Sequence, residues 1–488
     1  MIWPGRSSTV KSSSTGIEGK AGSMRPTQMN SRFLDNHPLW CVFGIMAVLL
    51  FIFISCSNAE EPNLPALTVA PVAPVQVPAP LPQHTVKPQA KAVIQIWLWG
   101  GPSHLDTFDP KPDAGYAYCG PFNKPITTNV PGIQINELLP LLAQQADKYS
   151  LIRSMTHGNN GHETAAYMML TGHKPGDGVV YPSVGSIVSY FKGYGHGYTG
   201  LIPPNIMLTE GEGRFAEEGF LGPLYKSFAT GGDPNAKQFN VEGVIAPGIS
   251  DERQSNRREM LHTLDTLGKA APDNADFAAL NKSEDKAYEL ILGETRKVFD
   301  LSGEPDAVRT RYGRNRFGQS CLMARRLVET GVPYVTINYG GWDTHKQHFE
   351  AMRRMLPILD QGLSALLQDL SDRHLLETTI VCCGGEFGRT PKIDWDAPWN
   401  GGRGHYGNCF SELVAGGGFQ GGHVVGASDA KGEKVMDRPV YPQDLIGSIF
   451  ELLGIDPDAK LPNPRGLDLQ VMPASDNAPG RGRLKEIM

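Results

Sequence analysis

Cysteine is scarce in this sequence and nowhere clustered for metal binding. The seven cysteines include no C-x-x-C pair, and they are Cys41, Cys56, Cys119, Cys321, Cys382, Cys383 and Cys409. Thiolate zinc sites and disulfide-stapled small domains both need closely spaced cysteines, so this pattern argues against both. Basic runs are also missing, and the formal net charge is -6, so no positive field would gather nucleic acid. Nucleic acid is therefore not an expected partner.

Long apolar runs are rare as well, and the clearest is PLWCVFGIMAVLLFIFIS at residues 38–55. Its length suits the apolar core of a signal peptide or a short membrane span. We therefore interpret residues 1–59 as an N-terminal leader and expect an exported protein that is periplasmic, on the cell surface or membrane-anchored. Cleavage after Ala59, a lipid anchor on Cys56 and an uncleaved membrane anchor are the alternatives. Contact with a membrane is expected only through this leader or lipid.

The rest of the chain divides into a linker and one large domain. Residues 60–90 alternate proline with small apolar residues, which favours an extended spacer that cannot form a core. Residues 91–488 alternate apolar strand-like runs with helical patterns, the latter at residues 136–149, 162–172, 250–330, 349–373 and 444–455. Strands separated by such helices predict an α/β fold with a largely parallel sheet and helices on both faces.

Four of the predicted strands end in glycine followed by polar, ligand-type residues. The four stretches are WLWGGPSHLD, SLIRSMTHGNNGHE, VTINYGGWDTH and TIVCCGGEFGR. The carboxyl ends of parallel strands meet at one edge of a sheet, where such folds hold their ligands. The alternative is that glycine and polar residues simply collect at strand exits. The recurrence over four strands favours a shared site.

Asp343 and His345 stand two residues apart just beyond a strand, so both can face one point on an extended loop. His405, in the glycine-rich GGRGHYGN, offers a third ligand. Carboxylate and imidazole together suit zinc, with manganese or iron as alternatives, better than calcium, which prefers oxygen ligands. The alternative is that Asp343 caps the next helix and His345 is a solvated turn residue.

Other polar residues at these strand exits are further candidates. A carboxylate at Glu386, leaving an apolar strand, must pair with a metal ion or with a cation such as Arg389. Arg389 and Arg403 could instead grip a phosphate, sulfate or carboxylate. His162 stands near the start of a helix, whose free N–H groups attract anions. His157 is either a ligand or a turn residue.

Five ordered motifs, spanning residues 92 to about 470, resemble the DUF1501 family, bacterial proteins related to the alkaline phosphatase and sulfatase superfamily. The motifs are GGPSHLDTFDPKP, RSMTHGNNGHETAAYMMLTG, GVPYVTINYGGWDTHKQHF, LLETTIVCCGGEFGRTPKI and GRGHYGNCFSELVAGGGFQGGHVVGASDAKGE. The resemblance implies an alkaline-phosphatase-like, three-layer α/β/α sandwich. It also implies the two-metal phosphate or sulfate ester chemistry of the wider superfamily.

The resemblance also implies roles for individual residues. Asp343 and His345 are similar to the pair that binds the first metal ion, with His405 as the later histidine ligand. Glu386 replaces the Asp of an Asp-His pair at the second ion, but Phe387 stands where its histidine would be.

The first strand and the nucleophile depart further from the superfamily pattern. The first strand ends in glycines and offers Asp106 only later, so we expect the second ion to be held by Glu386 with Asp106 or His162, and His157 remains a candidate ligand. The nucleophile's place falls near His162, with Thr164 beside it, and Arg389 would neutralise the ester oxygens.

The sequence therefore predicts an exported hydrolase of a phosphate or sulfate ester that uses one or two divalent metal ions. Zinc is the first choice, with manganese, iron or calcium as alternatives. The other prediction is a non-catalytic surface protein of the same fold that binds an anionic glycan or a cell-envelope partner.

Overall fold

A computed structural model describes residues 89–488, apart from residues 177, 210–216, 238, 240, 242–243, 245–248, 265–284, 286–287 and 474–482. The predicted leader at 1–59 and nearly all of the predicted linker at 60–90 lie outside the described residues. Both stay predictions. Among the helices of the described part, none combines the length and the hydropathy that a bilayer-spanning segment needs.

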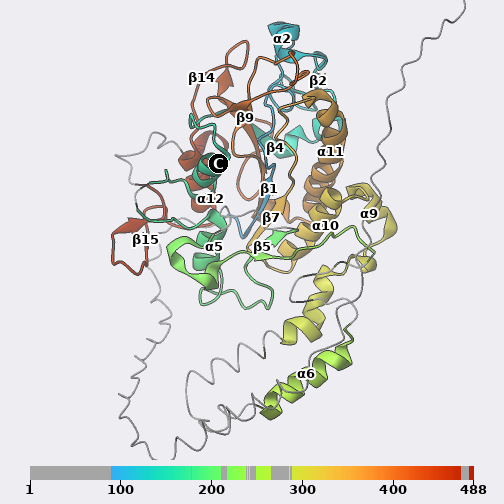
Figure 1. The fold of residues 1–488 in the computed structure, drawn as a ribbon, viewed down its shortest axis with the longest axis vertical. Coiled ribbons are helices and arrows are strands. Elements are labelled where there is room, and N and C mark those ends of the chain that lie inside the picture. The colour runs from blue at the N-terminus through green and yellow to red at the C-terminus, as the bar shows by residue number, and fades with distance from the viewer. Residues whose placement is uncertain are drawn as a thin grey trace, which may run out of the picture. The chain divides into compact units, whose positions relative to one another are not determined.

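An eight-stranded sheet forms the centre of the fold, in the order β12-β4-β11-β8-β1-β7-β5-β6 (Figure 1). Neighbouring strands pair parallel except at β11, which is antiparallel to β4 and β8. The strands are β1 (Ala92–Trp97), β4 (Tyr149–Met155), β5 (Asn205–Leu208), β6 (Phe228–Ala229), β7 (Tyr334–Asn338), β8 (Thr379–Gly384), β11 (Phe410–Ala415) and β12 (Val424–Val425). Because β1, β4, β7 and β8 run in the same direction, their carboxyl ends lie at one edge.

Helices cover both faces of this sheet, and strand β1 shows the division (Figure 1). Ile94 and Ile96 pack with residues of α10 and α11, whereas Val93 and Trp97 pack with residues of α4, α5 and α12. The helices are α2 (Tyr116–Cys119), α3 (Pro140–Ala143), α4 (His162–Thr171), α5 (Val184–Lys192), α6 (Asp251–Leu264), α9 (Asp306–Tyr312), α10 (Arg316–Glu329), α11 (His348–Asp372) and α12 (Pro442–Leu452). The predicted fold class, a three-layer α/β/α sandwich with a largely parallel sheet, is confirmed.

Predicted helices are present as α4, α11 and α12, and α6, α9 and α10 lie within the predicted helical stretch 250–330, but the helix predicted at residues 136–149 is wrong. That segment holds α3 and a 3-10 turn at Ala146–Lys148. The side chain of Asn136 accepts a hydrogen bond from the N–H of Leu138 (2.9 Å), which makes a turn. Pro140 has no N–H and suits only the start of a helix, so α3 begins there.

Short strand pairs flank the central sheet, and one of them carries predicted site residues. The pair β9 (Gly388–Arg389) and β10 (His405–Tyr406) sets Arg389 opposite His405, with residues 390–404 as the connecting loop. The other pairs are β2 (Ile126–Thr127) with β3 (Gln134–Ile135), β13 (Ala427–Ser428) with β14 (Val435–Asp437), and β15 (Lys460–Leu461) with β16 (Leu469–Gln470).

A carboxylic acid is buried within the central sheet, at Glu412 of β11. Its carboxyl group fills the space that a Cβ atom of Gly384 in β8 would need, which explains why that strand position is glycine. Burial raises the pKa of Glu412 well above 4.5. The folded protein therefore holds a proton that the unfolded chain releases.

We predict that Glu412→Gln removes part of the pH dependence of stability. Because the folded-state pKa is raised, the folded state binds more protons, and stability falls as pH rises above the unfolded value of 4.5. Relative to Glu412→Gln, the wild-type free energy of unfolding should fall by up to about 1.4 kcal/mol per pH unit. Denaturant unfolding at several pH values measures this difference. Glu350→Gln, at an exposed position of α11, is the matched control, and parallel curves for Glu412→Gln and wild type would contradict the prediction.

Candidate metal site

The loops that follow β1, β4, β7 and β8 meet at one edge of the sheet, so the predicted convergence of the four strand exits is confirmed. The N–H of Gly100 donates to Glu386 Oε1 (3.0 Å), and His157 Nε2 lies 2.7 Å from the carbonyl oxygen of Glu386. Gly100 has a φ of 110°, and a Cβ atom there would overlap the backbone of Asp343. Only glycine lets the first and third loops approach this closely.

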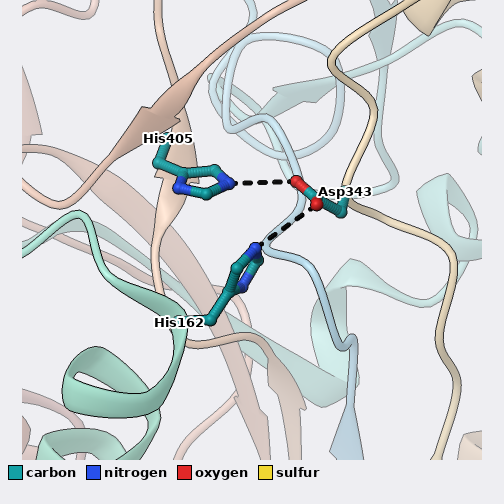
Figure 2. A group of neighbouring side chains, drawn as sticks. All are labelled: His162, Asp343 and His405. Carbon is teal, nitrogen blue, oxygen red and sulfur yellow. Dashed lines mark hydrogen bonds and ion pairs between the residues drawn. The ribbon is translucent and has the colours of Figure 1, made fainter.

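Asp343 is the centre of a cluster of histidines (Figure 2). His162 Nε2 lies 3.3 Å from Asp343 Oδ2, and His405 Nε2 lies 3.0 Å from Oδ1. His345 Nε2 lies 3.0 Å from the same Oδ1 and 2.8 Å from His405 Nε2. Ligand atoms of His162, Asp343 and His405 all lie within 4.8 Å of one another, a spacing that one metal ion could bridge. The start of α4, the loop after β7 and strand β10 thus supply one group.

The ring of His162 is held in place by Glu386. Its Nδ1 lies 2.5 Å from Glu386 Oε1, and Glu386 is fully buried. The rings of Trp99 and Phe387 lie against the imidazole, with centroids at 5.2 and 4.9 Å. The hydrogen bond to Glu386 raises the pKa of His162 despite partial burial. A carboxylate that orients a histidine in this way is a common partner of metal-binding imidazoles.

The ring of His405 is oriented by a different loop. Its Nδ1 lies 2.8 Å from the carbonyl oxygen of Asn160, and the Asn160 side chain accepts a hydrogen bond from Gly407 N–H (2.7 Å). Phe387 stacks on the imidazole at 4.6 Å. Phe387 therefore packs against two of the site histidines, His162 and His405.

The hydrogen-bonding pattern of the two rings fits a cation. Both ring nitrogens of His162 and of His405 face oxygen atoms, yet a neutral imidazole carries only one N–H. If each Nδ1 donates outward, the Nε2 lone pairs converge on Asp343, and a cation there would satisfy all three groups. Two imidazoles and a carboxylate form the ligand set of catalytic zinc sites and of some iron sites. Calcium prefers oxygen ligands, so the group suits a transition metal ion.

Arg389 holds the carboxylate of Asp343. Its guanidinium is fully buried; Nη2 lies 2.7 Å from Asp343 Oδ1, and Nε donates to the carbonyl of Gly101 (3.0 Å). Burial opposes ionisation of Asp343, but the hydrogen bond and charge of Arg389 outweigh it and lower the pKa to about 2. We expected Arg389 to contact ester oxygens. In the structure its donors contact Asp343 and the carbonyl oxygens of Gly100, Gly101 and Arg403, and contact with an ester stays a prediction.

His345 lies at the open side of the cluster, with 37% of its side chain exposed. Partial burial lowers the pKa of His345, against the opposing charge of Asp343. At neutral pH its imidazole is therefore uncharged.

Asp106, predicted to bind a second ion, lies outside this cluster. It is fully buried and pairs with Arg403, whose Nε lies 2.7 Å from Oδ2. His348 Nε2 lies 2.8 Å from the same oxygen, and its Nδ1 lies 2.6 Å from Thr344 Oγ1. Because Thr344 stands between Asp343 and His345 in the chain, Asp106 is linked through His348 to the loop that carries both residues.

His157 contacts the Glu386 segment, and Thr164 lies beside His162 at the start of α4, where the resemblance put it. His157 Nδ1 accepts the N–H of Asn159 (3.0 Å) while its Nε2 faces the carbonyl of Glu386, so neither ring nitrogen is left for a metal ion. Thr164 lies in the first turn of α4, and no described hydrogen bond or ion pair joins it to Asp343.

The sequence did not reveal several residues that contact the site and support it. Asn160 stands inside the GNNGHE turn, where asparagine signals a turn but not a partner for a distant histidine. His348 and Trp99 lie within quoted stretches, but their roles depend on contacts with residues far away in the sequence, Asp106 and His162.

We predict that Glu386→Gln weakens metal binding about 10- to 100-fold, the usual effect of losing such an orienting carboxylate. Glutamine keeps the volume but exchanges an anionic acceptor for a neutral amide beside His162 Nδ1. Calorimetric titration with zinc measures the affinity, and thermal unfolding checks that the variant folds. Equal zinc affinity in variant and wild type would contradict the role given to Glu386.

The sequence matches the model of the DUF1501 family, described as a protein of unknown function, over residues 90–478. A search among curated proteins found no match. Similar solved structures include Ps i-CgsB in complex with k-i-k-neocarrahexaose (12% identity, 76% of this chain, 72% of that chain, TM-score 0.35). A second is the PsFucS1 sulfatase from Pseudoalteromonas sp. (14% identity, 76% of this chain, 68% of that chain, TM-score 0.30). A third is the zinc complex of the C-terminal periplasmic domain of EcEptC from Escherichia coli (13% identity, 80% of this chain, 93% of that chain, TM-score 0.30). The chain belongs to the DUF1501 family.

Proposed function

We propose that this chain is an exported, metal-dependent hydrolase of a phosphate or sulfate ester. The observation that carries the proposal is the convergence of His162 Nε2, His405 Nε2 and an ionised Asp343 at the carboxyl edge of the sheet. Export rests on the uncharged apolar run at residues 38–55. In the reaction, the oxygen of water joins phosphorus or sulfur, the bond to the ester oxygen breaks, and a proton passes to the leaving alcohol.

His162, Asp343 and His405 would hold one divalent ion, zinc by first choice. The described residues contain one such group of three ligand-type side chains, and so we propose one ion. When bound, such an ion polarises ester oxygens and lowers the pKa of a water molecule.

The chain's own groups have separate tasks in this proposal. Glu386 and Arg389 keep His162 and Asp343 oriented, so little reorganisation is needed when the ester binds. His345 lies beside Asp343, and its neutral imidazole is placed to donate the Nε2 hydrogen to the Asp343 carboxylate (3.0 Å) and so to help orient it.

Elemental analysis of the purified full chain tests the metal assignment directly. We expect about one zinc ion per chain, as a site of three protein ligands requires. Hydrolysis of 4-nitrophenyl phosphate and 4-nitrophenyl sulfate should stop on chelation and return on adding zinc. A chain that binds no metal would overturn the proposal. Bound metal without hydrolysis of any phosphate or sulfate ester would favour the non-catalytic binding protein instead.

A further inference from the structure

Three exposed aromatic side chains stand near the candidate metal site. Tyr116, Trp395 and Trp399 are 62%, 40% and 37% exposed. Trp395 stacks on Tyr116, with centroids at 5.0 Å and planes at 10°, and also on Phe349, at 5.7 Å and 13°. The three rings of Phe349, Trp395 and Tyr116 therefore run as a stack from the core toward solvent. We call Tyr116, Trp395 and Trp399 the aromatic platform.

The platform is built on the same loop as the site. Trp395 and Trp399 lie in the loop of residues 390–404, which joins Arg389 to His405, two residues of the metal cluster. The N–H of Ile393 donates to the carbonyl of Ala117 (2.9 Å), which fastens this loop to α2, where Tyr116 stands.

The same loop, residues 390–404, also forms hydrogen bonds with the segment that carries Asp343 and His345. The N–H of Arg403 donates to Thr344 (3.2 Å), and the N–H of Gln347 donates to the carbonyl of Trp399 (3.1 Å). The Trp399 ring lies 6.3 Å from the ring of His345. Within the platform, Trp399 thus lies next to the metal cluster at His345.

Polar groups surround these rings. Lys346 Nζ lies 5.8 Å from the centroid of Trp399, and Asp394, Asp396 and Asn400 are exposed on the same loop. Flat apolar ring faces bordered by positively and negatively charged hydrogen-bonding groups suit a sugar ring. A sugar ring has C–H groups on its faces, which pack on an aromatic ring, and hydroxyls at its edge, which form hydrogen bonds. The two aspartates would repel a ring that carries its own sulfate or phosphate there.

We propose, building on the proposed function, that the substrate is a glycan. Its ester group would enter the site at Asp343 and His405, while neighbouring sugar rings that carry no ester stack on Tyr116 and Trp399. The platform would then select esters attached to sugar chains over esters of small alcohols.

Binding to immobilised oligosaccharides tests this proposal without relying on hydrolysis. The probes are unsubstituted, phosphorylated and sulfated oligosaccharides, presented to the full chain after chelation so that turnover does not interfere. We expect wild type to bind a subset, and Trp399→Ala and Tyr116→Ala each to weaken that binding by about tenfold, as for a central aromatic contact. Trp399→Phe should retain most of the affinity because a flat ring remains. Leu224→Ala, at a 58% exposed apolar residue outside the platform, is the matched control and should bind like wild type.

The possible results separate this proposal from the hydrolase proposal. Absence of any oligosaccharide binding, or equal binding by Trp399→Ala, Tyr116→Ala and wild type, overturns the glycan platform even where 4-nitrophenyl esters are hydrolysed. Glycan binding that needs the two aromatic residues, in a protein that hydrolyses no ester, supports the platform and overturns the hydrolase. The zinc content of each variant, expected to equal that of wild type, shows that the metal cluster is intact.

Discussion

Asp343→Ala is expected to abolish both metal binding and ester hydrolysis. Asp343 is the carboxylate toward which His162 and His405 point, and it is ionised because Arg389 lowers its pKa to about 2. Without it, two imidazoles remain and the negative charge that balances a divalent ion is gone. Zinc content should fall from about one ion per chain to near zero. Hydrolysis of 4-nitrophenyl esters should fall at least about a thousandfold, the loss of several kcal/mol of transition-state stabilisation.

Two further variants separate a lost ligand from a damaged fold. Asp343→Asn keeps the volume and one oxygen but removes the charge, and we expect it to lose most of its zinc as well. Asp458→Ala removes an exposed carboxylate outside the site and should keep wild-type zinc content and activity. Elemental analysis and initial rates, with circular dichroism for folding, provide the measurements. Equal slow hydrolysis by wild type and Asp343→Ala would show that the observed activity does not come from this site.

Asp106→Ala is expected to cause the largest loss of stability, about 3–5 kcal/mol, because it leaves a buried charge without a partner. Asp106 and Arg403 are both fully buried, and Arg403 Nη2 lies 3.2 Å from Asp106 Oδ1 in addition to the contact through Nε. Burial opposes the charge of Asp106, but Arg403 and His348 lower its pKa to about 2, so the carboxylate is ionised in the folded state. Denaturant unfolding at neutral pH measures the loss.

A double variant tests whether the unpaired charge of Arg403 causes the loss of stability. In the double variant Asp106→Ala, Arg403→Met, no unpaired guanidinium remains buried, and part of the lost stability should return. Asp458→Ala should stay within about 0.5 kcal/mol of wild type, as for an exposed substitution. A loss below about 1 kcal/mol for Asp106→Ala would show that Arg403 finds other partners, such as the carbonyl of Thr390 (2.9 Å), sufficient.

The strand exits were predictable because their signal is local. Each apolar run followed by glycine and polar residues marks a strand that ends in a loop, and parallel strands must end at the same edge. Asp343, His345 and His405 were singled out on this basis, and the structure brings them together with His162. The helix predicted at 136–149 does not form, although its apolar residues have helical spacing. Pro140 has no N–H to continue a helix, and the Asn136 side chain makes a turn before it.

The division of tasks among the charged residues was not predictable. The sequence offers Glu386 and Asp106 as metal ligands and Arg389 as a contact for ester oxygens, because a carboxylate or guanidinium near a strand end looks the same whether it faces solvent or a buried partner. The structure buries all three and supplies each with a partner, so they position the site from inside.

By itself, the amino-acid sequence determined the layered α/β fold and the edge of the sheet at which a site must lie, since hydrophobic periodicity and strand-ending glycines are read over a few neighbouring residues. Only the tertiary structure decided which side chains of the candidate site lie together, which buried charged groups contact them, and that an exposed aromatic ring stands beside His345. Those relations join residues tens to hundreds of positions apart, from Asp343 with Arg389 to His162 with Glu386, and they depend on side-chain directions that packing sets.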